Sequence, residues 1–419
     1  MKTSDTFRPF LAITLGYWCF MLTDGALRMI VLLHFHEMGL SPLNLANLFL
    51  IYEFVGILTN ISAGYLAKRF GLKSTLYTGM LFQIFALLLL SIIPDSWAIS
   101  QMIFFVALVQ AVSGIAKDLT KTSSKSSVKL LAPANNNSIL FFWVARLTGS
   151  KNAIKGLGFF VGCALIATLD FSTSLIILAV LLSIILATIA LLMPKNLHSG
   201  SKGVKFNQVF SKNRKINILS VARLLLFGAR DVWFVLGIPL YFFEAFSDGS
   251  QESNKFVFFG LGAFMSLWVI FYGLFQYFAP RFFKDLSSLK IERQALNWVT
   301  ILIITPAILF SISSFSYGLP KYVVLATIII GLFVFGAIFA VNSSLHSFLI
   351  LNYTNNDRVT MDVGYYYMAN ASGRLVGTFL SGFFFQLGGL SACLFASSIM
   401  LCLASLATFF LKTSQETLP

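Results

Sequence analysis

Long apolar stretches alternate with short polar segments along the whole of this 419-residue chain. A transmembrane helix needs about 20 mostly apolar residues, and these stretches are of that order. The pattern predicts twelve of them, at 10–33, 43–66, 74–93, 98–119, 152–170, 172–193, 217–243, 256–279, 294–314, 322–345, 362–386 and 390–411. We therefore expect an all-α polytopic membrane protein with twelve transmembrane helices.

The composition excludes a soluble globular domain. Hydrophobic residues make up 57% of the chain and charged residues only 11%, whereas about 25% of a soluble domain is charged. The first apolar stretch is too long for the core of a secretory signal, and it contains Asp24 and Arg28. We interpret it as a retained transmembrane helix that embeds in the lipid bilayer.

The longest polar segment, 194–216, lies between the sixth and seventh stretches and carries six Lys and Arg residues. We interpret it as a cytoplasmic linker between two six-helix halves, 1–193 and 217–419. Lys155 and Arg374 lie in corresponding helices, and each is followed by Gly after three residues and Phe after five. Asp24 and Asp231 lie at similar depths in the first and seventh stretches. Such echoes are expected of paired repeats.

The positions of Lys and Arg predict the orientation, because cytoplasmic loops are enriched in them. With the N-terminus inside, 24 of the 30 Lys and Arg residues fall on the inner side, and only Lys255 and Lys321 fall outside. We expect both termini in the cytoplasm and the chain in a bacterial inner membrane. The net charge of +14 is then a topology signal. Because it is spread over short loops, no nucleic-acid partner is expected.

Ionisable residues inside a membrane span are costly and by default mark a site or a pathway. Away from the span ends, five cations lie in the predicted spans against three acids, and this surplus favours a small anionic solute. The planar fork of arginine suits phosphate, carboxylate and arsenate oxygens. The candidate substrate-binding residues are the five cations, Arg28, Lys155, Arg223, Arg230 and Arg374.

Depth separates the two arginines of the seventh stretch. Arg223 lies nearer the cytoplasmic end, where a mouth residue or a snorkelling side chain is the alternative. Arg230 lies near mid-span and is expected to be the better ligand. The first and seventh helices correspond in the two repeats, so Arg28 and Arg230 are expected on opposite sides of one central path. The alternative is that each arginine only neutralises an adjacent acid, Asp24 or Asp231.

The three acids within the spans are candidate proton carriers, since a buried carboxyl group can titrate near neutral pH. They are Asp24, Glu53 and Asp231. For Glu53, a structural partnership with an arginine is an equal alternative.

The remaining residues predict little further chemistry. No nucleophile–base arrangement is present, so we expect neither an enzyme nor a catalytic residue. We also expect no cofactor, and His34 with His36 is too weak a pattern for a metal site. The cysteines lie in apolar stretches without close spacing, and we interpret them as small buried side chains. They are Cys19, Cys163, Cys393 and Cys402.

Two further segments have structural interpretations. The run Tyr365–Tyr367 near the start of the eleventh stretch is typical of an interfacial aromatic belt. The segment 117–150, rich in Lys, Ser and Asn, has an amphipathic piece around Trp143 and Arg146, and we expect a helix on the membrane surface there.

The loop GYLAKRFGLKS, from Gly64 to Ser74, resembles the loop signature of the major facilitator superfamily. The glycines Gly64 and Gly71 and the cations Arg69 and Lys73 match. The acidic position of the signature is Lys68 here, and one basic position is Leu72. The resemblance implies the major facilitator fold, and these departures put in doubt any gating ion pair made through that acid.

More specific runs are similar to organoarsenical efflux permeases of the ArsJ type, namely YWCFMLTDGALRM (17–29), SGIAKDLTKTSSKSSVKLL (113–131), LTGSKNAIKGLGFF (147–160) and RLLLFGARDVWFV (223–235). The resemblance covers essentially the whole chain. It implies export of 1-arseno-3-phosphoglycerate, made by a partner glyceraldehyde-3-phosphate dehydrogenase, and hence arsenate resistance. Import or exchange of organophosphates and drug:proton antiport stay open as alternatives. We expect a monomer.

Overall fold

The computed structural model describes residues 3–94, 96–131, 137–193, 211–279, 288–315, 320–354 and 359–413, all of whose regular elements are α-helices. The described helices are α1 (Thr3–Glu37), α2 (Pro42–Phe70), α3 (Leu72–Ser91), α4 (Ile99–Leu131), α5 (Asn137–Thr168), α6 (Phe171–Leu192), α7 (Arg214–Phe234), α8 (Gly237–Phe246), α9 (Gln251–Phe278), α10 (Ser288–Phe315), α11 (Lys321–Tyr353) and α12 (Val359–Thr413). The all-α class is confirmed.

Nine of the described helices are long and apolar enough to cross a membrane. One of them, α12, contains two expected spans, because Gly388 and Gly389 have non-helical backbone angles between them. Gly389 has φ of 61°, a conformation that favours glycine. The expected boundary at 386–390 is therefore found at this kink. The seventh expected span is also in two pieces, α7 and α8.

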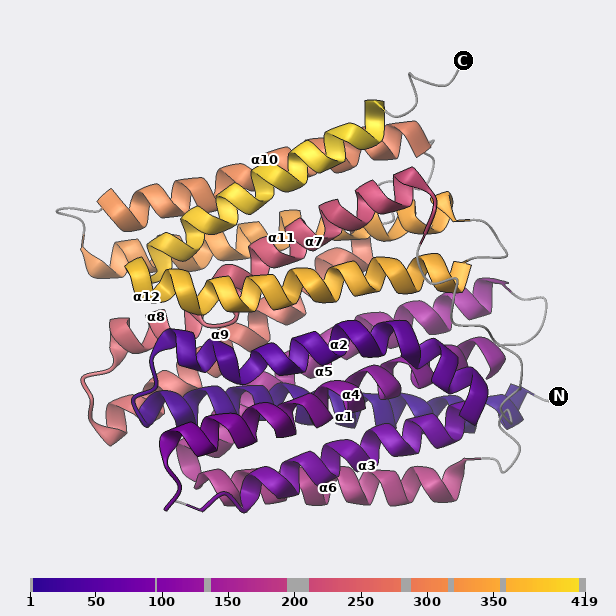
Figure 1. Ribbon diagram of the computed structural model, residues 1–419, viewed down its shortest axis with the longest axis horizontal. Coiled ribbons are helices and arrows are strands. Elements are labelled where there is room, and N and C mark those ends of the chain that lie inside the picture. Colours follow the sequence, from indigo (N-terminus) through magenta and orange to yellow (C-terminus); the bar gives the residue numbers. More distant parts are fainter. Residues whose placement is uncertain are drawn as a thin grey trace. The chain divides into compact units, whose positions relative to one another are not determined.

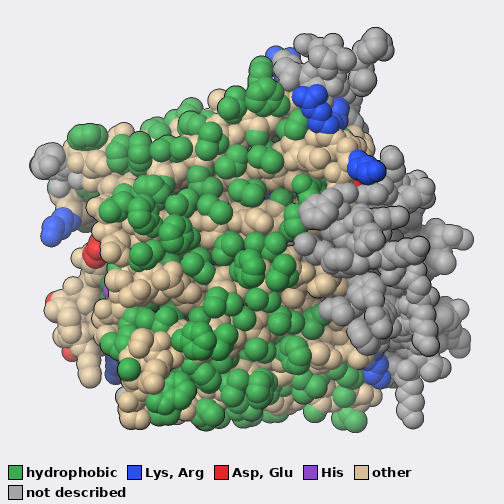
Figure 2. Space-filling view, in the orientation of Figure 1, with side chains coloured by type: hydrophobic (Ala, Val, Ile, Leu, Met, Phe, Trp, Pro, Cys, Tyr) green, Lys and Arg blue, Asp and Glu red, His purple; other side chains and the backbone are tan. Residues whose placement is uncertain are grey.

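Apolar side chains cover the surface that a membrane would contact. Leu191, Phe256, Phe104 and Ile330 are among the large hydrophobic side chains that remain exposed. On the face drawn in Figure 2, hydrophobic side chains spread across the helices, and the visible Lys and Arg residues lie near the helix ends. A monomeric soluble protein rarely exposes large contiguous apolar patches, so this surface is that of a multi-pass membrane protein.

The chain forms two compact units. Unit 1 comprises 1–39, 58–206 and 247–270, and unit 2 comprises 40–57, 207–246 and 271–419. Both α2 and α9 therefore contribute to each unit. The linker predicted at 194–216 lies mostly outside the described residues, which resume at 211 with α7 beginning at Arg214.

Within unit 1, α1 packs against α5 and α6, and α3 packs against α4 and α6. Its core includes Ile13, Tyr17, Phe20, Leu76 and Leu182, all of which are fully buried. Within unit 2, α12 packs against α7 and α10, and α10 packs against α11. Figure 1 draws these helices side by side within each unit.

The structure corrects the expected surface helix in 117–150. Residues 117–131 continue α4, and residues 137–150, including Trp143 and Arg146, are the start of α5. Pro133 lies between the two helices, and the segment from 137 to 168 contains no proline to interrupt it. These polar residues therefore lengthen α4 and α5 beyond the apolar segments that were predicted as spans.

The backbone conformation explains why the loop signature has a glycine at position 71. This residue ends α2 and begins α3 with φ of 87°, where a side chain would be strained. The neighbouring Thr75 hydroxyl donates to the Gly71 carbonyl at 2.7 Å.

Candidate functional site

Asp231 on α7 is held by two arginines in unit 2. Its side chain is 1% exposed, and one carboxylate oxygen lies 2.5 Å from Arg230 Nη2. Arg230 Nε donates to that same oxygen at 2.7 Å. Arg374 on α12 donates from Nε to the other oxygen at 3.3 Å. Arg230 therefore has an adjacent acid as its partner, one of the two alternatives that the sequence leaves open.

Arg374 extends this network to α2. Its Nη2 donates to Glu53 Oε1 at 2.5 Å, and the Glu53 side chain is 1% exposed. Glu53 lies in the part of α2 that belongs to unit 2. The order Arg230, Asp231, Arg374, Glu53 alternates in sign, so two cations and two anions compensate one another in a poorly solvated region. Glu53 is thus a partner of an arginine, as one alternative predicts.

A matching pair lies in unit 1. Lys155 on α5 donates to Asp24 Oδ2 on α1 at 2.6 Å, and Asp24 is 2% exposed at its side chain. Asp24 and Lys155 correspond by the sequence echo to Asp231 and Arg374. An acid of the first expected span is thus paired with a cation of the fifth, and an acid of the seventh with a cation of the eleventh, as paired repeats would have it. Arg28, one turn after Asp24 on α1, is half-buried.

Glycines bring the paired helices together. A Cβ at Gly158 would meet the backbone of Leu22, and one at Gly162 would meet Ala26. In unit 2, a Cβ at Gly373 would meet the backbone of Leu224. Small residues allow helix backbones to approach closely in lipid. This proximity places the ion-paired side chains within reach of each other.

Arg223 differs from the other arginines of unit 2. It is 5% exposed, so its guanidinium lies inside unit 2 and not on the surface. Its Nε donates to Asn370 Oδ1 at 3.1 Å, and its Nη1 donates to the carbonyl and the hydroxyl of Ser343 at 3.1 and 3.0 Å. The guanidinium also lies over the rings of Phe227 and Tyr366. No carboxylate contacts it in the described part of the chain.

The tyrosine run does not form a simple interfacial belt. Tyr366 is 1% exposed and belongs to the apolar core of unit 2, whereas Tyr365 and Tyr367 are half-buried. Helical geometry explains the difference, because successive residues of a helix point about 100° apart. Tyr366 therefore faces α7.

Three buried acids, Asp118, Glu292 and Asp362, were not predicted as site residues; Asp362 on α12 accepts from the Thr354 hydroxyl at 3.0 Å. Asp118 on α4 accepts from Thr59, Asn60 and Lys121 at 2.9, 3.2 and 3.0 Å. Glu292 on α10 accepts from Lys215 at 3.2 Å and from the hydroxyl of Tyr353 at 2.5 Å. Asp118 and Glu292 lie beside cations at the ends of apolar stretches, where charged residues are common. The spacing of Asp118 and Lys121, three residues apart, was the available signal of an intrahelical pair.

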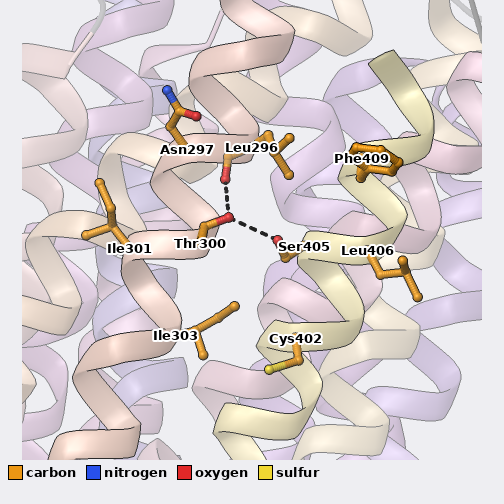
Figure 3. Close-up of a pocket in the computed structure, with 9 residues that line it drawn as sticks. All are labelled: Leu296, Asn297, Thr300, Ile301, Ile303, Cys402, Ser405, Leu406 and Phe409. Atoms are coloured by element: carbon orange, nitrogen blue, oxygen red, sulfur yellow. Dashed lines mark hydrogen bonds between the residues drawn. The ribbon is translucent and has the colours of Figure 1, made fainter. Parts of the chain in front are cut away.

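A groove of about 770 Å³ lies between α10 and the second part of α12, but its chemistry is apolar. Figure 3 shows its lining, which includes Ile301, Leu406 and Phe409. Thr300 Oγ1 donates to the Leu296 carbonyl and lies 3.1 Å from Ser405 Oγ across the groove. None of the candidate cations or acids lines it, so it lacks the charges that an anion site needs.

The cysteines are free, and Cys19, Cys163 and Cys393 are buried as expected. Cys402 is exposed and lines the groove, which corrects its expected burial. Among the described residues, no cluster of three or more His, Cys, Asp or Glu side chains could hold a metal ion. His34 instead stacks on Phe171 with ring centroids 4.1 Å apart.

Comparisons with known proteins place the fold. Two solved structures are 14% identical with a TM-score of 0.71. One, a POT family transporter in complex with 5-aminolevulinic acid, aligns over 97% of this chain and 96% of its own; the other, the nucleoside transporter NupG in mutant form, aligns over 97% and 99%. No curated protein matches the sequence. Residues 13–350 match the family described as Major Facilitator Superfamily. The chain therefore belongs to the Major Facilitator Superfamily and has the fold of a secondary transporter.

Proposed function

We propose that this transporter exports a small organic anion, most specifically 1-arseno-3-phosphoglycerate, and thereby confers arsenate resistance. One observation carries the anionic solute: in unit 2, Arg223 is 5% exposed, and the described residues that bond to it, Asn370 and Ser343, are neutral. The four sequence runs similar to ArsJ-type permeases supply the particular solute. In this proposal the membrane is a bacterial inner membrane, and a glyceraldehyde-3-phosphate dehydrogenase makes the solute.

The ion pairs suggest how solute and protons would be coupled. A solute oxyanion that binds Arg374 competes with Glu53 and Asp231 for the same guanidinium. A carboxylate that loses its cation in a poorly solvated place is stabilised by taking a proton. The pair of Lys155 and Asp24 would respond to the solute in the same way. Export driven by inward proton movement follows if binding and protonation alternate between the two sides.

Import or exchange of organophosphates is the competing function, because the same charges would serve either direction. The similar solved structures are of a transporter bound to 5-aminolevulinic acid and of a nucleoside transporter. At 14% identity they share the fold with this chain, and their solutes give no choice between the two directions.

The experiment uses an arsenate-sensitive host. Expression of the transporter together with the dehydrogenase should raise arsenate resistance, whereas either protein alone should not. Cells with both proteins should also release organic arsenic into the medium. Resistance that is independent of the dehydrogenase would contradict the proposed solute. Uptake of labelled 3-phosphoglycerate into everted vesicles, with and without a pH gradient, then tests direction and coupling.

A further inference from the structure

One buried cation of unit 2, Arg223, has no carboxylate partner among the described residues. Arg230 and Arg374 are compensated by Asp231 and Glu53. Arg223 is buried to the same degree as a core residue, yet the described residues that bond to it are the neutral Asn370 and Ser343. An uncompensated buried cation is costly. The cost has a functional reason if an anion supplies the missing charge.

A buried histidine near Arg223 lacks hydrogen-bond partners among the described residues. His346 on α11 is 1% exposed, and neither of its ring nitrogens has a partner in the described structure. It lies three residues after Ser343 and so on the same helix face. The Tyr366 side chain is also buried and lies beside Ser347, and its ring centre is 5.1 Å from the Arg223 guanidinium. Buried polar groups are normally satisfied.

Phe227 separates this cluster from the compensated network. Its ring centre lies 3.9 Å from the guanidinium carbon of Arg223 and 4.9 Å from that of Arg230. The ring thus lies between two like charges on one face of α7, and cation–π attraction to both lowers their mutual repulsion. Arg223 is held in place without an acid, which leaves its charge available.

We propose that Arg223, His346 and Tyr366 form the anion-binding subsite of unit 2 and take a phosphate or carboxylate group of the solute. Arg223 Nη2, which bonds to no described residue, provides the charged donor. The His346 ring and the Tyr366 hydroxyl provide neutral donors on α11 and α12. The subsite deepens the proposed function and rests on it. It assigns recognition in unit 2 to Arg223, whereas depth along the span favours Arg230.

The test measures binding of 3-phosphoglycerate to the purified full-length protein in nanodiscs by calorimetry, with inorganic phosphate and neutral glycerol as comparison ligands. The variants are Arg223→Gln, Arg223→Lys, His346→Gln and Tyr366→Phe. Arg293→Gln, which removes an exposed cation of α10, is the matched control. Thermal unfolding without ligand is measured for each variant.

We expect Arg223→Gln to weaken 3-phosphoglycerate binding by about 10- to 100-fold, because a hydrogen bond to a charged group is lost. Tyr366→Phe and His346→Gln should weaken it by several-fold, and Arg293→Gln should bind as the wild type does. The unfolding temperature of Arg223→Gln should not fall, since no buried acid loses its partner.

Unchanged affinity in Arg223→Gln, or a lower unfolding temperature with normal affinity, would overturn the subsite and leave Arg223 a packing residue. If the wild type binds neither 3-phosphoglycerate nor phosphate, the organic-anion function itself fails. Equal binding of glycerol would overturn charge recognition.

Discussion

Arg374 on α12 and Glu53 on α2 are 321 residues apart in sequence and 2.5 Å apart between Nη2 and Oε1. The same guanidinium reaches Asp231 on α7. One side chain therefore links three helices of unit 2 and neutralises two buried carboxylates in part.

Replacing Arg374 with Gln should destabilise the protein strongly. Glu53 would lose its guanidinium partner and Asp231 one of two, and breaking a buried pair costs about 3–5 kcal/mol. The free energy of unfolding, measured with SDS in mixed micelles, checks this. The double variant Arg374→Gln, Glu53→Gln should recover part of the loss. An Arg374→Gln protein of wild-type stability would show that the network is solvated and weak.

The glycines between paired helices should tolerate no side chain. Gly158→Ala and Gly373→Ala would press a Cβ against the backbones of Leu22 and Leu224, and overpacking of this kind costs roughly 1–3 kcal/mol. The same unfolding measurement checks it. Gly260→Ala on α9, where a Cβ meets nothing within 4 Å, is the matched control and should be neutral or stabilising. Equal stability in all three variants would refute close helix approach.

The buried acids should separate exchange from accumulation. We expect at least one of Asp24→Asn, Glu53→Gln and Asp231→Asn to retain exchange between solute pools in vesicles but to lose accumulation driven by a pH gradient. The reason is that an amide keeps the shape of the side chain and cannot carry a proton. Normal accumulation in all three variants would mean that the coupling group lies elsewhere or that the driving ion is not a proton.

Topology should follow the distribution of Lys and Arg. Tags at both termini and a reporter within 194–216 should be cytoplasmic, and a reporter at Ser250, which is exposed just before α9, should be on the outer side. Accessibility to a membrane-impermeant reagent in intact cells measures this. Labelling of the linker and Ser250 from the same side would refute the twelve-helix arrangement.

Hydropathy located most of the helices, because the cost of exposing polar backbone to lipid requires helices wherever the chain is apolar. The expected spans at 152–170 and 217–243 lie in α5 and in α7 with α8, which are not among the nine described helices that are long and apolar enough to cross a membrane. Hydropathy also located the interruption at Gly388–Gly389. The break between α7 and α8 was missed, although Gly237 and Pro239 stand inside the expected span. Apolar character continues through both residues, so the pattern alone carries no sign of the break.

The site was predicted in part. The echo between Asp24 and Asp231 and between Lys155 and Arg374 indicated equivalent positions, and the structure shows that these residues form the ion pairs. The surroundings of Arg223 could not be predicted, because His346 and Tyr366 come from helices more than a hundred residues away. The sequence pattern of one helix does not show whether a side chain such as His346 has hydrogen-bond partners on other helices.

The break between α7 and α8 is closed by a residue of another helix. Ser381 Oγ on α12 accepts from the backbone amides of Leu236 and Gly237 at 3.1 and 3.3 Å. Arg374 and Ser381 are seven residues apart, which is two turns on one face of α12. Any shift of this face that releases Arg374 from Glu53 also moves the oxygen on which both amides depend. The two pieces of the seventh span would then reorient in the same step that opens the charge network.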